Sequence, residues 1–324
     1  MKNDHKNIDI IDPKNQLNLF GYEDYFSSFI KLYKKDKLPN IILLNGPKGI
    51  GKATFAYHFI NYLLSNNEEN KYLINDFKID HKNVSYKLMS NETHPNFFLL
   101  QNNLFDEDIK IDQVRSLLRF LSKSAFSRNI KIVMIDNAEY LNLNSSNALL
   151  KALEEPNNST FFFIIQNSSS KILNTIKSRC IEFKFFFNTE QKKQIFTNIN
   201  QEYKLDFNLK NFHDNFYFDT PGNLLRYLIF FNGSNIDIYS DKLSCILYLL
   251  EKYKSKKDFE LLSVASLFIE LYYNELSLNN SENLNFYFMN KHKILNEINN
   301  MKKFNLDKKN LLISLQGILL NESR

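Results

Sequence analysis

The sequence predicts an α/β protein with a parallel sheet in its first half and a purely helical region behind it. Short apolar runs alternate with longer amphipathic stretches up to about residue 187, which is the pattern of βαβ units. A glycine-rich stretch lies between the first apolar run and the first amphipathic stretch, where such folds bind phosphate. From about residue 232 onward only helical periodicity remains.

Five strands are expected in the first half. Each is a short run dominated by large apolar residues and bounded by polar or turn-forming residues, as buried strands of parallel sheets are. Because the first four are separated by stretches long enough for a helix, they fit consecutive βαβ units. The runs are Ile41–Leu44, Phe97–Leu100, Ile130–Ile135, Phe161–Ile165 and Ile181–Phe187.

Helices are expected between these strands, at Lys52–Leu64, Ile111–Ser122 and Ser145–Glu155. Apolar residues recur in them at helical spacing, and Pro156 ends the third because proline cannot continue a helix. The stretch Ser65–Asn91 is polar and irregular, which predicts an insertion or a loosely packed helix.

The second half is expected to be helical. Short helical pieces fill Thr189–Phe231 around the turn signal Thr220-Pro221-Gly222, and the asparagine-rich stretch Ser277–Asn285 predicts an exposed loop. The expected domains are residues 1–187, 188–232 and 233–324. Helical spacing in the last of these is clearest at Leu243, Ile246, Leu247 and Leu250, and again at Leu311, Leu312 and Leu315.

Composition excludes several classes of protein. The formal charge of +5, from 41 basic and 36 acidic residues, is spread along the 324 residues and does not argue for a nucleic-acid-binding face. Cys180 and Cys245 are too few and too far apart for a disulfide framework or a thiolate metal site. No apolar run approaches the ~20 residues of a membrane span, and the N-terminus is too polar for a signal peptide. A soluble cytoplasmic protein without a membrane partner is expected.

The glycine-rich stretch NGPKGIGKAT, residues 45–54, matches the phosphate-binding loop pattern G-x-x-x-x-G-K. Three of the seven glycines of the chain fall within it, and this clustering indicates a backbone conformation that requires glycine. In such a loop the peptide N–H groups and one lysine surround phosphate oxygens at a helix N-terminus. The alternative is a tight strand-to-helix turn with a surface lysine. The candidate nucleotide-binding residues are Gly46, Pro47, Gly49, Gly51, Lys52, Ala53, Thr54 and, from a later strand, Asp136.

Groups that ATP hydrolysis uses are missing around this loop. Ala53 stands where a hydroxyl would reach magnesium, and Thr54 is turned from that direction by about 100° on a helix. Asp136 ends an apolar strand, where a carboxylate would lie beside the metal. Asn137 follows it, and an amide cannot take a proton from water, while Glu139 is expected to point elsewhere. The sequence therefore leaves binding of ATP or ADP and of magnesium open, and predicts no useful hydrolysis.

Taken together, the motifs resemble the clamp-loader subunits of bacterial DNA polymerase III, which are of the AAA+ class. The resemblance implies an AAA+ P-loop domain with a parallel sheet, then a small helical lid and an all-helical C-terminal collar. Within that group the chain looks most like the delta-prime subunits, in their alphaproteobacterial form. The stretches that carry the resemblance, over residues 17–187, are the P-loop, THPNFFLL, IKIDQVR, KIVMIDNAE, NALLKALEEP, FFFIIQNSSS and TIKSRC.

Departures from the family's tau/gamma motor subunits favour the delta-prime type. Those subunits carry a zinc-binding cysteine cluster before the THP motif, whereas Ser65–Asn91 contains no cysteine, so no zinc is expected. They also carry an arginine near the Thr-Pro-Gly turn that reads the γ-phosphate, and the matching position here is Gly222. The sensor position after the fourth strand holds Gln166 or Asn167.

The resemblance gives Arg179, in the SRC triplet of TIKSRC, a catalytic role in trans: its guanidinium would act as an arginine finger on a neighbouring subunit's nucleotide. The alternative is a structural salt-bridge partner before a strand.

The resemblance also implies partners. They are the delta and tau/gamma subunits, the sliding clamp and, through the complex, primed-template DNA, all within the polymerase III holoenzyme. Two other functions remain in competition, an ATP-hydrolysing tau/gamma-like motor and a small-molecule P-loop kinase, although the kinase leaves SRC and the helical tail unexplained. Lys151 and the helix around it have two possible interpretations: a direct contact with DNA, or a solvent-exposed face of an amphipathic helix.

Overall fold

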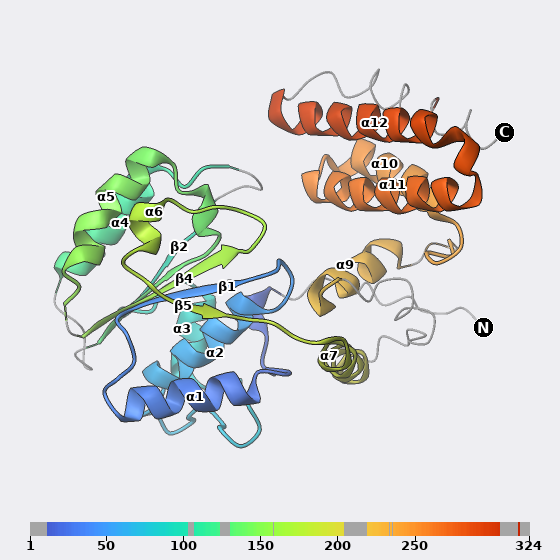
Figure 1. Cartoon of the computed structure of the whole chain (residues 1–324). Coiled ribbons are helices and arrows are strands. Elements are labelled where there is room, and N and C mark those ends of the chain that lie inside the picture. The colour runs from blue at the N-terminus through green and yellow to red at the C-terminus, as the bar shows by residue number, and fades with distance from the viewer. Residues whose placement is uncertain are drawn as a thin grey trace. The chain divides into compact units, whose positions relative to one another are not determined.

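The chain forms two compact units, with the boundary inside helix α9 (Pro221–Phe231). The first runs from Ile10 to Leu225, and the second comprises the described residues from Arg226 onward. The expected domain boundaries at residues 187 and 232 stay predictions. The computed structural model (Figure 1) describes residues 12–102, 107–123, 130–157, 159–203, 219–232, 234, 236–304 and 317.

A parallel sheet with the strand order β2-β3-β4-β1-β5 forms the centre of the first unit. β1 lies between two strands that come much later in the chain, so that Ile42 is opposite both Phe163 and Ile181. All five expected strands are confirmed, although β1 and β4 are longer than expected and β5 is shorter. The strands are β1 (Ile41–Gly46), β2 (Phe97–Leu100), β3 (Lys131–Ile135), β4 (Thr160–Asn167) and β5 (Ile181–Lys184).

Helices cover both faces of this sheet (Figure 1). Successive side chains of a strand point to opposite faces, so Ile42 and Leu44 enter one core while Ile41 and Leu43 enter the other. The three expected helices are confirmed, and α5 begins two residues earlier than expected. One face carries α1 (Glu23–Lys34), α2 (Lys52–Leu64) and α3 (Val84–Ser90), and the other carries α4 (Ile111–Ser122), α5 (Leu143–Glu154) and α6 (Asn174–Lys177).

Aromatic side chains fill the core beneath α1 and α2. The Phe55 ring lies 5.1 Å from that of Phe29 and 4.9 Å from that of Phe185, both near edge-to-face, which is a preferred geometry for aromatic pairs. Removing one such fully buried ring typically costs about 3–5 kcal/mol. This core fixes α2 on the sheet, and α2 begins where the glycine loop ends.

The stretch Ser65–Asn91 is packed, so the loosely packed helix, one of the two alternatives expected there, is wrong. Tyr72, Ile79 and Met89 are all buried in the core beneath α2. Glu68 accepts hydrogen bonds from the backbone N–H groups of Val84 (2.9 Å) and Ser85 (3.1 Å), which satisfies the free N-terminus of α3. The few apolar residues of this stretch are enough to hold it, because a polar local sequence does not prevent tertiary packing.

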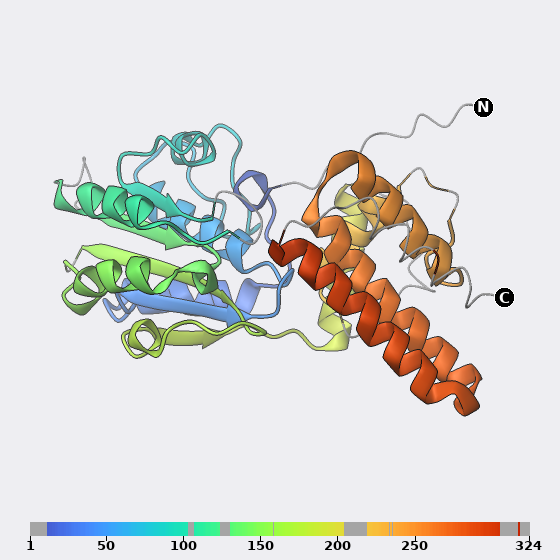
Figure 2. The same cartoon turned by 90° about the horizontal axis from the view of Figure 1, so that it is seen from above.

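The second unit contains three long helices, and Figures 1 and 2 show α11 and α12 running alongside each other. The exposed loop expected over Ser277–Asn285 is shorter than expected: α11 continues to Asn279 and α12 starts at Leu284, with a 3-10 turn (Ser281–Asn283) between them. The apolar positions Leu311, Leu312 and Leu315 lie outside the described residues. The helices are α10 (Lys242–Lys256), α11 (Phe259–Asn279) and α12 (Leu284–Phe304).

The remaining described elements of the chain are short, apart from α7. In the part that the structure describes, no helix combines the length and the apolar character that crossing a membrane requires. These elements are the 3-10 turns η1 (Pro13–Asn15) and η2 (Ala138–Tyr140) and the helix α7 (Thr189–Glu202).

Candidate functional site

The glycine loop between β1 and α2 is held by its own carbonyl groups. Each carbonyl from Gly46 to Gly51 accepts at least one hydrogen bond from elsewhere in the chain. A trans peptide directs its N–H opposite to its C=O, so this arrangement turns the loop N–H groups away from these partners. The donors, in order along the loop, are Ser168 N (3.0 Å), Lys52 Nζ (2.8 Å), Thr220 Oγ1 (2.8 Å), Gly222 N (3.0 Å), Tyr22 hydroxyl (2.9 Å) and Phe55 N (2.9 Å).

Two of the loop glycines are required by the backbone. Gly49 and Gly51 have φ of 78° and 101°, in the left-handed region that glycine adopts without strain. The fully buried ring of Tyr22 lies beneath the loop, 3.2 Å from the place of a Cβ on Gly51, and donates its hydroxyl to Ile50 O. The glycines predicted from the sequence therefore have a structural cause.

The start of α9 is seated directly on the loop. A Cβ on Gly49 would lie 2.4 Å from Thr220 Oγ1, and a Cβ on Gly222 would lie 2.5 Å from Gly49 O. Since real Cβ atoms do not approach this closely, neither position accepts a side chain while α9 stays in place. At Gly222, which the sequence predicts to match an arginine of the motor subunits, the Gly49 carbonyl occupies the place of a side chain.

Lys52 folds back into the loop that it follows. Its ammonium donates to Gly46 O (2.7 Å), Pro47 O (2.8 Å) and Asn167 Oδ1 (3.0 Å), and the residue is only 5% exposed. An ammonium has three N–H donors, so the chain itself engages all of them. Burial lowers the pKa of Lys52 to about 8, against the opposite effect of the charges of Asp136 and Glu139.

Glu139 belongs to the site, and the expectation that it points elsewhere is wrong. Its carboxylate accepts hydrogen bonds from the backbone N–H (3.4 Å) and the side-chain amide of Asn167. Asn167 in turn accepts from Lys52, so a carboxylate is connected to the loop lysine through one amide. Of the two candidates for the sensor position, Asn167 is the one that contacts Lys52.

Asp136 lies near Lys52, at the end of β3. Burial raises the pKa of this carboxyl to about 6, while the Asn137 backbone N–H (2.9 Å) and the charge of Lys52 act in the opposite direction. Asn137 has a φ of 53°. Asparagine tolerates this left-handed conformation better than most residues, so the backbone conformation explains why asparagine occupies this position.

The residues present could hold a phosphate group, but the hydroxyl that would reach its magnesium ion is absent at Ala53. The turn geometry of Gly49 and Gly51 and the position of Lys52 are those of a phosphate-binding loop. Ala53 packs its methyl group against the core beneath α2, and no hydroxyl is available there. A bound phosphate would have to replace acceptors that Lys52 already has.

The SRC triplet closes the C-terminal end of the short helix α6. Ser178 Oγ and Arg179 Nη1 donate to Thr175 O, at 3.3 and 2.6 Å, and Cys180 Sγ donates to Ile176 O at 3.1 Å. Burial raises the pKa of Cys180 to about 12, so its thiol is a packing group rather than a nucleophile.

The Arg179 guanidinium also forms an ion pair with Glu154 of α5, with Nη2 2.5 Å from Oε1. The side chain is 30% exposed. The structure thus gives Arg179 the salt bridge that the structural alternative predicts, at a place that solvent reaches.

Comparison with known proteins identifies the family. The model of the family described as DNA polymerase III, delta subunit, matches residues 21–188, which include the glycine loop and SRC. The chain belongs to this family. It is 37% identical over 140 residues to DNA polymerase III subunit delta' of Pseudomonas aeruginosa, covering 43% of this chain and 41% of that protein. With DNA polymerase III subunit delta' of Escherichia coli the identity is 27% over 159 residues, 48% of this chain and 45% of that protein.

These matches confirm the predicted delta-prime kinship. The chain spans about half the length of the curated relatives it matches. Among solved structures, a gamma subunit-related protein of DNA polymerase III from Thermotoga maritima overlaps with a TM-score of 0.49 at 19% identity, covering 91% of this chain and 99% of that one. The alphaproteobacterial form stays a prediction.

The sheet topology and loop placement agree with the fold expected from the sequence. A parallel sheet with the glycine loop after β1, helices on both faces and helices in the C-terminal part confirm the expected α/β AAA+ fold. Among the residues that the structure describes, no group of three or more His, Cys, Asp or Glu side chains is arranged to hold a metal ion.

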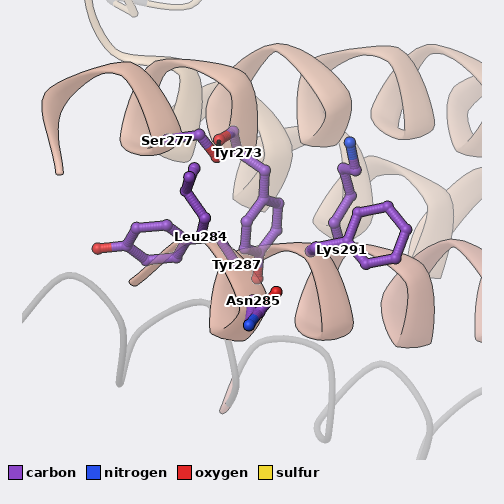
Figure 3. A pocket seen from close by; sticks show the side chains of 7 residues that line it. Tyr273, Ser277, Leu284, Asn285, Tyr287 and Lys291 are labelled. Carbon is purple, nitrogen blue, oxygen red and sulfur yellow. Dashed lines mark hydrogen bonds between the residues drawn. The ribbon is translucent and has the colours of Figure 1, made fainter. Parts of the chain in front are cut away.

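The helical unit of this family member carries a surface pocket that the sequence did not indicate. It opens between α11 and α12, and its walls are mostly aromatic and aliphatic, with Lys291 as the charged residue (Figure 3). Such a lining suits contact with another apolar surface better than it suits chemistry. The lining residues are Tyr273, Ser277, Leu284, Asn285, Tyr287, Phe288 and Lys291.

Replacing Asp136 by Asn should stabilise the protein at neutral pH. The pKa of this carboxyl is raised from 3.8 to about 6 in the folded state, so the folded state favours the protonated form. The resulting loss of stability is absent below pH 3.8, grows as the pH rises to about 6 and is complete above it. We expect Asp136→Asn to gain about 1–3 kcal/mol in urea unfolding at pH 7.5 and to lose most of that advantage at pH 4. Asp76→Asn, at an exposed position, is the control; the same gain for Asp136→Asn at both pH values would contradict the explanation.

Replacing Gly222 by Ala should destabilise the protein, although alanine favours a helix over glycine by about 1 kcal/mol. The new methyl group would meet Gly49 O and force α9 away from the loop. A steric conflict of this kind typically costs about 1–3 kcal/mol, so we expect the melting temperature to fall by several degrees. A higher melting temperature would mean that α9 is not seated on the loop.

Proposed function

We propose that this chain acts as a delta-prime-type subunit of a DNA polymerase III clamp loader, helping to load a sliding clamp onto primed DNA. The observation that carries the proposal is the family match over residues 21–188, which spans both the glycine loop and the SRC triplet. Its curated relatives named subunit delta' support the same assignment.

Its partners in this proposal are the delta and tau/gamma subunits, the clamp and, through the complex, DNA. Large apolar side chains are exposed at the end of α11 and the start of α12, which is typical of a contact surface. A helical surface of this kind suits a collar that joins subunits. The exposed residues are Leu278, Leu284, Phe286, Phe288 and Met289.

In this proposal the chain does not hydrolyse ATP by itself. Ala53 cannot bind magnesium through its side chain, Asn137 cannot take a proton, and Lys52 is engaged by the loop. Binding of ATP or ADP through the loop N–H groups stays open. The alternative, a tau/gamma-like motor, requires the groups that these positions lack.

Arg179 acts on a neighbouring subunit's nucleotide in this proposal. Its partly exposed guanidinium lies in the SRC triplet at the start of β5. An arginine finger typically contributes about 10³–10⁵ in rate, or ~4–7 kcal/mol of transition-state stabilisation. This contribution does not depend on the glycine loop of the subunit that supplies the arginine. A chain whose own loop does not support hydrolysis can therefore still supply an arginine finger.

The purified chain should release no phosphate from ATP above background, because the metal ligand and the base are both missing. The measurement is a phosphate-release assay on the chain alone, beside Lys52→Ala. Turnover that disappears in Lys52→Ala would contradict the proposal and favour the motor subunit.

Replacing Arg179 by Ala should leave assembly intact and reduce the ATPase of the whole complex when it is stimulated by DNA and clamp. The site that Arg179 serves should lose about 10³-fold or more in rate. Arg115→Ala is the matched control, because Arg115 is also an exposed arginine in an ion pair, with Asp112 at 2.9 Å. If a correctly assembled Arg179→Ala complex keeps its stimulated rate, Arg179 is not a finger.

A further inference from the structure

The partner of Arg179 within this chain has a role that neither the motifs nor the comparisons assign. Glu154 is the last residue of α5, and its carboxylate meets the guanidinium at 2.5 Å. The same guanidinium donates to Thr175 O at 2.6 Å through Nη1, so two contacts fix its direction.

The position of Glu154 is unfavourable for a carboxylate without such a partner. The C-terminal end of a helix carries partial negative charge, which disfavours an acid in the last turn. Pro156 follows shortly after, so α5 does not continue beyond this turn. Lys177 of α6 is engaged elsewhere: it lies 3.5 Å from Glu182, which also accepts from Asn45 at 2.6 Å.

The ion pair is weak enough to be exchanged. Its two side chains are 30% and 51% exposed, and exposed ion pairs contribute little because water and salt screen them. A triphosphate presents several charged oxygens that an arginine binds through paired hydrogen bonds, which is a stronger contact. A neighbouring nucleotide at this surface would therefore compete successfully for Arg179.

We propose that Glu154 is a positioning residue that holds Arg179 in a standby conformation, and that Arg179 exchanges Glu154 for the neighbouring subunit's phosphate when the complex closes. This inference rests on the proposed function, since it concerns the same arginine. The contact with Glu154 lowers unstimulated hydrolysis, because Arg179 leaves the Glu154 carboxylate only when the neighbouring phosphate is within reach. It does not limit the stimulated rate, because the engaged state then dominates.

The experiment uses the assembled clamp-loader complex with Glu154→Gln in this chain. Without clamp and DNA, we expect ATPase about two- to five-fold above that of the wild-type complex, which is the effect of losing an exposed ion pair at 1.4 kcal/mol per tenfold. With clamp and DNA the rate should stay within about 1.5-fold of wild type, so the stimulation ratio falls. Glu154→Asp keeps the charge on a shorter side chain and should give an intermediate ratio.

Glu155→Gln is the matched control, because Glu155 is the exposed neighbour at the C-cap of α5 and should leave both rates unchanged. An unchanged stimulation ratio in Glu154→Gln, or an equal fall of both rates, would overturn the inference. The double variant Glu154→Gln/Arg179→Ala should behave like Arg179→Ala alone. If the Arg179→Ala complex keeps the wild-type ATPase rate, the proposed finger role of Arg179 is wrong. If the Arg179→Ala complex is inactive while the Glu154→Gln complex has wild-type rates, only the standby role of Glu154 is wrong.

Discussion

The first unit depends on how its glycine loop is held. Six consecutive carbonyl groups are each tied to the chain, by the helix that follows the loop, the end of β4, Tyr22 beneath it and the start of α9 above it. Unpaired buried carbonyls cost free energy, so these bonds fix the loop without any bound molecule. Lys52 completes the arrangement, because its ammonium donates hydrogen bonds to the carbonyls of Gly46 and Pro47. A loop held in this way keeps its shape without the hydroxyl that Ala53 lacks.

The same constraint connects elements that are far apart in sequence. Tyr22 comes before the sheet and Thr220 after it, yet both donate to neighbouring carbonyls of one loop. The SRC triplet is also held by hydrogen bonds to backbone carbonyls. Its side chains donate to the last carbonyls of α6 and so fix where β5 begins. In both places a motif that carries the family resemblance is also part of the scaffold.

The five strands and the helices α2, α4 and α5 could be predicted from the sequence, because each strand is a short apolar run and each of these helices has a 3.6-residue period. The helices α1 and α6 were not predicted. The loop was predictable because its glycines are clustered. The place of Glu139 was not, since it depends on η2 and on the amide of Asn167, which come from different parts of the chain. The asparagine-rich stretch before α12 indicated a loop by composition, but α11 extends to Asn279 and α12 begins at Leu284, so the connection is shorter than composition predicted.

The position of β1 in the middle of the sheet also has a consequence for biosynthesis. Ile42 is opposite Phe163 on one side and Ile181 on the other, so neither neighbour exists when β1 leaves the ribosome. Its four buried apolar residues must wait until a long stretch of later sequence has been translated, which exposes them to association with other nascent chains. During that interval the emerging polypeptide is a natural client for chaperones.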